Sequence, residues 1–374
     1  MALTVTDEST SIVILRASDF ASGDPYLQWD DPTDIARIPP WKLAALLANP
    51  LRLGFDDPVE IVGLRGRTVV GKMDLIVGAA AIDGQVIPVL WTSMLIVPEQ
   101  FRGTLMGALI VLKMQQMMPT VAACAVSVAA LPVYEKLKWM HFRLHRHILL
   151  RRSRPVVERY FGEGFPSRVA NCAADAGLIA LRAATGPFAA LLTRGLHCRQ
   201  AARMDPALDH RIGACDRPAC FVRSAAWVNW ALDHPSCDDP RDRRGLFIVY
   251  DRQERIVGYF LLKSRFYPVA THRGFKNLFL GSLSDWIALE PQALGFTQIV
   301  LLASMELARW DVDAIEVCIS DGEPAPNLRP WGFVPVGDLH LLVKASARSP
   351  LSDPKYAKSS AWRIRPAEGD NFLV

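Results

Sequence analysis

The residues that decide the fold join an apolar, strand-like run to a helical pattern and read Val97-Pro98-Glu99-Gln100-Phe101-Arg102-Gly103-Thr104-Leu105-Met106-Gly107-Ala108. A proline ends the strand, and two glycines lie where the helix begins. The first N–H groups of a helix have no acceptor within it, so several donors point to one place beside this turn. Because the helix dipole also favours negative charge there, the junction predicts an anion-binding site.

Antiparallel strands precede this junction, and helices alternate with strands after it. Three strand-like runs come first, with Asp83-Gly84 as a hairpin signal between the second and the third. They cover residues 59–64, 69–82 and 86–97. After the junction, the apolar pattern predicts a helix over 103–118, a strand over 121–128, a helix over 131–137 and a half-buried strand over 140–148. The run at 121–128 is almost wholly apolar, which is typical of a parallel strand buried on both faces.

The N-terminal half resembles the GNAT superfamily of acyl-CoA-dependent N-acyltransferases, in the order of its elements and in two motifs. These are Arg102-Gly103-Thr104-Leu105-Met106-Gly107 and Leu131-Pro132-Val133-Tyr134-Glu135-Lys136-Leu137. The resemblance implies that acetyl-CoA or another acyl-CoA binds at Leu95, Ile96, Val97, Arg102, Gly103, Thr104, Leu105, Met106, Gly107 and Ala108. The strand residues would offer a backbone N–H to the thioester carbonyl. Tyr134 falls where the family places the acid that protonates the departing thiolate.

Each of these assignments has a structural alternative. An ordinary strand-to-helix junction with a surface arginine would contain the same residues. Leu105 stands where the family pattern has a glycine, and its side chain would crowd the approach to a phosphate. Tyr134 could instead be half-buried against the sheet with its hydroxyl in solvent.

The sequence does not identify a general base. Family members often carry a glutamate on the fourth strand, but the equivalent segment here is Leu90-Trp91-Thr92-Ser93-Met94. Asp83, Glu99 or His141 could act through water, and each has an equally simple structural role. His141, His145 and His147 share one strand face, but no carboxylate or cysteine nearby completes a metal site, so a solvated or interface face is the better interpretation.

The second half repeats the same plan more faintly. Strand-like runs at 245–250, 256–263 and 278–283 precede a helix over 291–309 and strands over 313–319 and 339–344. Gln292-Ala293-Leu294-Gly295-Phe296-Thr297 only partly echoes the pyrophosphate motif, so this half is expected to have lost cofactor binding. We predict an α/β fold with an α+β mixed sheet, in two tandem GNAT-like domains. The N-terminal domain covers 1–154, a helical linker 155–204 and a degenerate domain 205–374.

Composition limits the class of protein. The chain has 374 residues, 51% hydrophobic and 21% charged, with a net charge of +4, which suits an anionic ligand but gives no signature of nucleic-acid binding. Its seven cysteines form no CxxC pair, and the N-terminus has no signal peptide pattern, so a cytoplasmic protein is expected. The apolar stretch 173–193 contains Asp175, Arg182 and Pro187, which favours an interfacial or domain-bridging helix over a transmembrane segment.

The sequence therefore favours an N-acyltransferase that acts on a primary amine of a small molecule, with an amino sugar of a polysaccharide or glycolipid precursor as an acceptor by analogy. A homodimer is compatible with it. One rival is a Fem-like aminoacyl transferase, which also pairs two GNAT-like domains but takes its acyl group from charged tRNA. Another is a non-catalytic binding or scaffold protein built from two decayed GNAT domains, which Leu105 and the missing strand carboxylate would favour.

Overall fold

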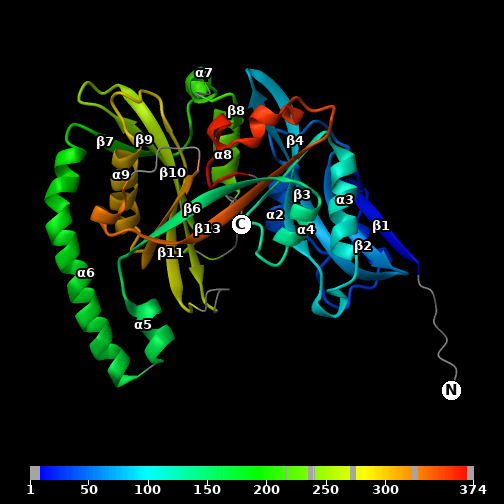
Figure 1. The fold of residues 1–374 in the computed structure, drawn as a ribbon, viewed down its shortest axis with the longest axis horizontal. Helices are drawn as coiled ribbons and strands as arrows, with labels where there is room; N and C mark the ends of the chain where they lie inside the picture. Colours follow the sequence, from blue (N-terminus) through cyan, green and yellow to red (C-terminus); the bar gives the residue numbers. More distant parts are fainter. Residues whose placement is uncertain are drawn as a thin grey trace.

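The computed structural model describes residues 9–162, 164–214, 217–234, 239, 241–269, 275–321 and 327–368. Its two halves lie side by side and share one continuous mixed sheet, with helices on both faces (Figure 1). Cys215 and Cys237 lie outside the described residues. The predicted mixed α/β fold with two similar halves is confirmed.

The elements of the N-terminal half follow the predicted order. They are β1 (Thr10–Arg16), α1 (Ala17–Ala21), η1 (Pro25–Gln28), α2 (Pro40–Leu47), β2 (Pro58–Arg65), β3 (Thr68–Ile82), β4 (Gln85–Ile96), η2 (Glu99–Phe101), α3 (Met106–Met117), β5 (Thr120–Cys124), α4 (Leu131–Lys136) and β6 (Met140–Leu150). Asp83 and Gly84 both have positive φ, +47° and +82°, so the predicted hairpin forms between β3 and β4. The strand expected over 121–128 ends at Cys124, and the rest of it is a loop.

The remaining elements include three short strand segments that the sequence pattern does not predict. The connection contains α5 (Arg154–Phe161), α6 (Phe165–Leu192) and β7 (His197–Ala201). The C-terminal half contains η3 (Pro206–Leu208), α7 (Asp209–Ile212), β8 (Ala219–Phe221), α8 (Ala225–Asp233), β9 (Arg243–Tyr250), β10 (Ile256–Tyr267), β11 (Leu278–Ala288), α9 (Phe296–Arg309), β12 (Ala314–Ser320), η4 (Arg329–Trp331), β13 (Val334–Ala345), η5 (Pro350–Ser352), η6 (Pro354–Ala357), η7 (Ser359–Ala361) and β14 (Trp362–Arg363). The unexpected strands are β7, β8 and β14, which are too short to show a period.

The two halves exchange their last strands. The sheet runs β1-β2-β3-β4-β5-β13-β6-β12-β11-β10-β9-β7, so β13 pairs with β5 of the first half and β6 pairs with β12 of the second. β6 and β13 also pair with each other, antiparallel, in the middle of the molecule (Figure 1). The predicted boundary at residue 154 therefore separates the two halves along the chain. In space, the sheet of each half includes a strand from the other half.

Helices cover the sheet on both faces. On one face, α3 and α4 pack on the N-terminal strands and α9 packs on the C-terminal strands. On the other, α2 and α8 lie together in the largest core cluster, which spans both halves. Trp227 and Trp230 of α8 are each 5% exposed, and the Trp230 indole donates to the Ala45 carbonyl of α2 at 2.8 Å. These tryptophans therefore pack the interface between the halves, as the sequence predicts for helix packing.

The end of β4 continues beyond its pairing with β5. β4 pairs in parallel with β5 only over Leu90–Thr92, although β4 continues to Ile96. The register between β3 and β4 shifts at the same place, and Met94 has a φ of +56°, which marks a bulge. β4 thus continues past the end of β5 at Cys124, which leaves a gap beside β4 at this end of the sheet.

A buried network of charges lies under this bulge. The Lys42 ammonium of α2 lies 2.8 Å from an Asp74 carboxylate oxygen and donates to the Ser93 hydroxyl of β4 at 2.5 Å. Lys72 lies 3.0 Å from Asp74 and 3.5 Å from Glu60, and all four charged side chains are 2% exposed or less. The Asp74 carboxylate compensates the two ammonium groups within the core, whereas burial raises the pKa of Glu60 and favours its protonated form.

We expect replacement of Glu60 by glutamine to change the pH dependence of stability. Burial raises the pKa of Glu60 to about 8, whereas a free glutamate titrates near about 4.3. The folded protein therefore holds a proton on Glu60 that the unfolded chain releases. The contribution of this group to the unfolding free energy is complete below the unfolded pKa and is lost as pH rises through the folded pKa. The unfolding free energy of the wild type should fall relative to Glu60→Gln from about pH 5 to about pH 8, by at most about 1.4 kcal/mol per pH unit.

Urea unfolding at several pH values measures this difference. Glu99→Gln, at an exposed position, serves as the matched control and should follow the wild type. If Glu60→Gln and the wild type show the same pH dependence, Glu60 is not held protonated in the folded protein.

Candidate functional site

A groove of about 860 Å³ opens where β4 continues past the end of β5. Its walls are the end of β4, the turn into α3, and the loop from β5 into α4. The lining residues are Leu95, Ile96, Val97, Phe101, Arg102, Gly103, Thr104, Leu105, Gly107, Ala108, Ser127, Ala129, Ala130, Val133, Lys136 and Leu137. The structure thus brings together every residue that the resemblance assigns to the cofactor, except Met106.

Met106 faces the core instead of the groove. Its side chain is 4% exposed and lies over Gly63 of β2, where an added Cβ would come within 2.3 Å of the Met106 sulfur. The absence of a side chain at Gly63 lets α3 approach the sheet closely, and Met106 fills the space between them. Met106 therefore fixes the position of α3 from below, while its neighbours in the sequence line the groove.

The groove has the features of an anion site. Arg102 is exposed on one wall, its Nε donating to the Val97 carbonyl at 3.4 Å, and Lys136 lies on the opposite wall. Gly107 and Ala108 lie in the first turn of α3, where N–H groups lack acceptors within the helix. Two basic side chains and a helix N-terminus are suited to the phosphates of CoA.

Leu105 does not fill this site. Its side chain is 75% exposed at the N-terminal end of α3, so it borders the groove and leaves the helix N-terminus open. Gly103, by contrast, has a φ of +88°, a conformation that glycine adopts without strain. The backbone turn that the family pattern implies is therefore present although one of its glycines is missing.

Tyr134 does not line the groove. It is 2% exposed, and its ring packs edge-on against Trp139 with centroids 4.9 Å apart. Its hydroxyl is hydrogen-bonded to Thr92 of β4, and burial raises its pKa to about 12. The sequence places Tyr134 correctly on α4, but the helix turns the side chain into the core. Its role as the acid stays a prediction.

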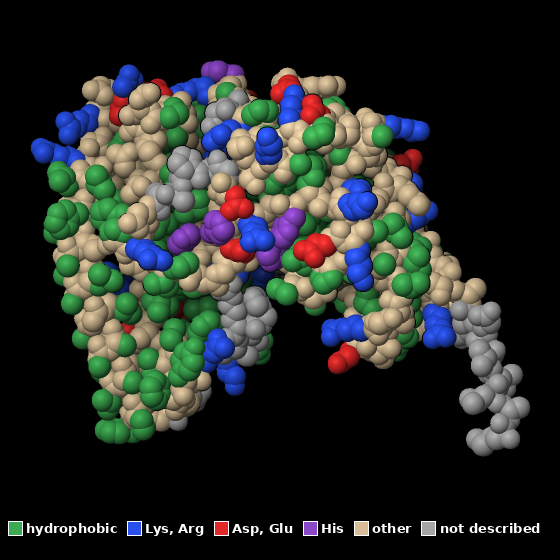
Figure 2. Space-filling view, viewed as in Figure 1, with side chains coloured by type: hydrophobic (Ala, Val, Ile, Leu, Met, Phe, Trp, Pro, Cys, Tyr) green, Lys and Arg blue, Asp and Glu red, His purple; other side chains and the backbone are tan. Residues whose placement is uncertain are grey.

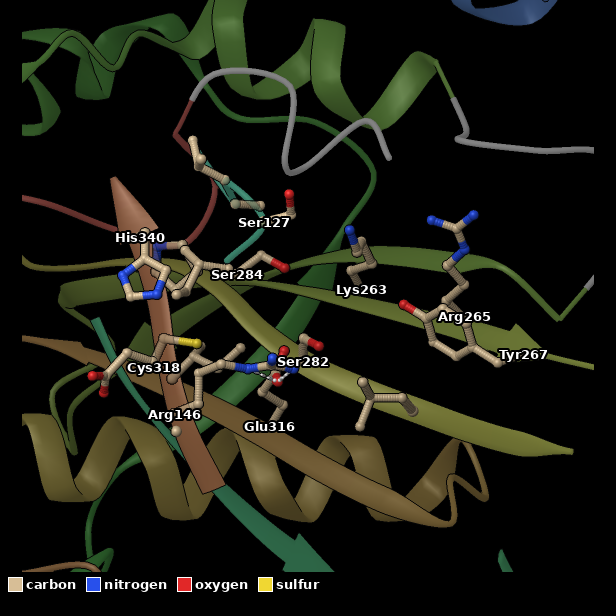
Figure 3. Close-up of a pocket in the computed structure, with 18 of the residues that line it drawn as sticks. Ser127, Arg146, Lys263, Arg265, Tyr267, Ser282, Ser284, Glu316, Cys318 and His340 are labelled. Atoms are coloured by element: carbon tan, nitrogen blue, oxygen red, sulfur yellow. Dashed lines mark hydrogen bonds and ion pairs between the residues drawn. The ribbon is translucent and has the colours of Figure 1, made fainter. Parts of the chain in front are cut away.

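A second cavity, of about 760 Å³, lies between the halves, where residues of β6, β10, β11, β12 and β13 face the loop after β5 (Figure 3). Its polar lining includes Ser127, Arg146, Lys263, Arg265, Ser284, Glu316, Asp338 and His340. Ser127, in the loop after β5, lines both this cavity and the groove, so this loop forms a wall of both spaces.

His340 is the histidine that faces this cavity, and the sequence analysis did not single it out. It lies on β13, and its carbonyl accepts a 3.4 Å hydrogen bond from the Val126 N–H, which places it next to the Ser127 loop. Its Nδ1 lies 3.0 Å from Nε2 of His141 on β6. Burial and the neighbouring His340 lower the pKa of His141. Of the three sequence candidates for the base, His141 is thus the one that contacts a cavity residue.

Basic side chains line the far wall of the cavity. Arg146 pairs with Glu316, while Lys263 and Arg265 lie together on β10 (Figure 3). Burial and the charges of Arg244 and Arg265 lower the pKa of Lys263 to about 7. Burial and positive charge in this part of the cavity therefore disfavour the protonated form of an amine.

None of the other sequence candidates for the base or for a metal site lines the groove or the cavity. Asp83 accepts from Lys355 and Tyr356 at the β3–β4 hairpin, where these bonds lower its pKa. Glu99 is exposed in η2. His145 contacts Asp338 at 2.9 Å and Asp321 at 2.5 Å, and the hydrogen bond to Asp338 raises its pKa. Within the described ranges, no group of three or more His, Cys, Asp or Glu side chains has the geometry of a metal site.

No protein-family model matches the sequence, and no curated protein matches it. Solved structures do match its fold. A crystal structure of Saccharomyces cerevisiae N-myristoyltransferase with bound myristoyl-CoA has a TM-score of 0.56 at 13% identity, over 94% of this chain and 81% of that one. A conserved protein from Enterococcus faecalis V583, described as a probable N-acyltransferase, has a TM-score of 0.50 at 10% identity, over 90% and 73%. The chain thus has the fold of GNAT-type N-acyltransferases, with two GNAT-like halves.

We expect Tyr134→Phe to lower stability without weakening CoA binding. The change removes a buried hydroxyl and leaves Thr92 without this partner, which should cost about 1 kcal/mol of unfolding free energy. Urea unfolding and a CoA titration measure the two effects. Tyr160→Phe is the matched control, because Tyr160 is 72% exposed on α5. A variant that is as stable as the wild type but turns over more slowly would instead favour the acid role of Tyr134.

Proposed function

We propose that the protein is an acyl-CoA-dependent N-acyltransferase that transfers an acyl group to a primary amine. The observation that carries this proposal is that Ser127 lines both the groove, which has the features of an anion site, and the cavity between the halves, which would hold an acceptor. The groove residues would hold the CoA phosphates and pantetheine, and the cavity would hold the acceptor. When bound, acyl-CoA supplies an activated thioester carbonyl for direct attack by the amine.

The end of β4 would orient the thioester. Backbone N–H groups near Leu95, Ile96 and Val97 have no β5 partner, since the pairing between these strands ends at Thr92. One such donor, aimed at the carbonyl oxygen, contributes about 3 kcal/mol to a transition state in enzymes where it has been removed. The bulge at Met94 would thus let this end of β4 bind the thioester carbonyl.

The cavity would favour the nucleophilic form of the acceptor. The same burial and positive charges that lower the pKa of Lys263 would act on an amine bound beside it. The neutral amine, which is the form that can attack, would then be populated near pH 7. An acceptor amine bound beside Lys263 would thus be subject to the same burial and positive charge as Lys263.

His340 is our candidate for the group that takes the proton from the attacking amine. Its Nδ1 faces His141, which leaves Nε2 on the opposite side of the ring. If Nδ1–H donates to the neutral His141, Nε2 has a free lone pair for the proton. This assignment needs no carboxylate on β4, whose absence from the sequence favoured a decayed, non-catalytic domain.

The two rivals make different demands. A Fem-like aminoacyl transferase would have to bind charged tRNA, yet the described lining of the groove and cavity contains paired charges and apolar walls besides its few basic residues. A scaffold protein would not need Arg102, Lys136 and the first turn of α3 to face one groove. CoA binding separates all three proposals.

We expect the purified protein to bind CoA and acetyl-CoA with about micromolar affinity, and Arg102→Glu to abolish this binding. The variant replaces an attractive charge beside the pyrophosphate with a repulsive one. Calorimetric titration measures the affinity. Arg348→Glu makes the same charge change at an exposed position away from the groove and should bind like the wild type. If neither CoA nor acetyl-CoA binds the wild type, the acyl-CoA proposal is wrong.

We expect His340→Gln to reduce kcat by at least about tenfold and to leave CoA affinity unchanged. In the wild type, activity should fall at low pH, because a protonated His141 can no longer accept the Nδ1–H of His340. A screen of primary amines with acetyl-CoA, followed by a pH profile of the best acceptor, measures both effects. His147→Gln, on the same strand as His141, is the control. Full activity in His340→Gln would remove His340 from the mechanism.

A further inference from the structure

The outward face of α6 is apolar along almost its whole length. This helix lies at the outer edge of the C-terminal half, and hydrophobic side chains cover the part of the surface that it forms (Figures 1 and 2). Its exposed large side chains are Phe165 (77%), Val169 (55%), Ile179 (59%), Leu181 (39%), Phe188 (65%), Leu191 (63%) and Leu192 (45%). From Val169 to Leu192 the only charged residues are Asp175 and Arg182. A helix that faces water normally carries charged side chains on that face, so this one is expected to be covered.

The two charged residues in the middle of α6 fix the helix to the protein. The Asp175 carboxylate accepts from the Ser153 N–H at 2.7 Å, and Arg182 donates to the Arg151 carbonyl at 3.0 Å. At the other end, Gln298 of α9 donates to the Leu192 carbonyl at 2.9 Å. The side chains that weighed against a transmembrane segment in the sequence thus point inward, and the apolar face is held outward.

The helix lies along a surface and does not cross a membrane. By length and composition alone, its 28 residues could span a bilayer. However, β6 before it and β7 after it belong to the same sheet. A single crossing would put these strands on opposite sides of the bilayer, which the sheet forbids. With a rise of about 1.5 Å per residue, α6 instead offers an apolar strip of about 40 Å parallel to the protein surface.

The charged residues around this apolar face indicate which kind of surface covers it. Arg168 and Arg194 are exposed at its two ends, and neither side chain has a partner among the described residues. Arg159 lies beside the exposed Tyr160 and Phe161 at the turn between α5 and α6. Of the five arginines in residues 159–199, Arg182 faces inward and Arg199 pairs with Glu254, which leaves Arg159, Arg168 and Arg194 around the apolar face. Arginines that flank an apolar, aromatic-ended helix favour anionic lipid.

A second copy of the chain fits this charge pattern less well. If two α6 helices packed antiparallel, Arg168 of each would lie near Arg194 of the other. If they packed parallel, like residues would meet. In both arrangements, arginines approach each other without an exposed acid of α6 between them. We therefore infer that α6 docks on an anionic membrane surface, with its axis in the plane of the interface.

This docking is independent of the acyl transfer proposed above, because α6 contributes no residue to the groove or the cavity. The test is co-sedimentation of the full chain with vesicles of phosphatidylcholine alone and of phosphatidylcholine mixed equally with phosphatidylglycerol. We expect binding to the anionic vesicles and at least about tenfold weaker binding to the neutral ones. Added salt should weaken the binding.

Paired substitutions locate the docking face. The double variant Phe188→Glu, Leu191→Glu should lose at least about tenfold in vesicle affinity. Leu27→Glu, Leu53→Glu changes two equally exposed side chains, 77% and 62%, in the N-terminal half and should bind like the wild type. Arg168→Gln with Arg194→Gln should remove the preference for anionic lipid. CoA titration of each variant shows whether the acyl-CoA site is intact, so the two proposals fail separately.

Hydrogen exchange on the unmodified protein provides a measurement that needs no variant. Anionic vesicles should slow exchange in 165–192 and leave the α3 region unchanged. Failure of the wild type to bind anionic vesicles would overturn the inference, as would binding that the α6 variants do not weaken. A wild-type dimer in analytical ultracentrifugation that Phe188→Glu, Leu191→Glu converts to monomer, without vesicle binding, would assign the face to a second copy of the chain.

Discussion

The structure depends on the pairing of β6 with β13 at its centre. Each strand comes from one half and completes the sheet of the other, so backbone hydrogen bonds join the halves across the whole molecule. This pairing fixes their relative position without a hinge. It also places His340 of the C-terminal half beside Val126 and Ser127 of the N-terminal half. The cavity between the halves therefore exists only because the strands are exchanged, and neither half alone would form it.

The groove depends on a different interaction, the buried charges beneath β4. Lys42 holds Ser93 and Asp74 together at the point where the β3–β4 register shifts. Moving charges into the core is costly, and removing one partner would leave the other uncompensated. A bulge supported in this way is difficult to flatten, and β4 has no β5 partner beyond Thr92. The apolar core beneath α3 fixes the opposite wall, with Met106 over Gly63.

The sequence predicts what local chemistry determines. A strand, a proline and two glycines at the start of a helix predict an anion site, and the resemblance to acyltransferases implies the groove residues between Leu95 and Ala108, all of which line the groove except Met106. The pairing of His141 with His340 joins residues 199 positions apart, and no periodicity reports it. Tyr134 shows an intermediate case, since its helix is predictable but its direction depends on packing against Trp139 and Thr92. Likewise, Asp175 and Arg182 appear to interrupt an apolar segment until the fold shows that both face inward.

The cavity between the halves and the apolar face of α6 share no residues, so binding at one need not change the other. The proposed acceptor cavity lies between the halves and is bounded by sheet strands and by the loop after β5. α6 lies outside α9, fixed by hydrogen bonds at both ends, with its apolar side chains already exposed. Docking this face would bury apolar area without changing the backbone of the sheet. A protein with this arrangement could remain at a lipid surface while its acceptor cavity stays assembled, which suits an acceptor that is itself held at that surface.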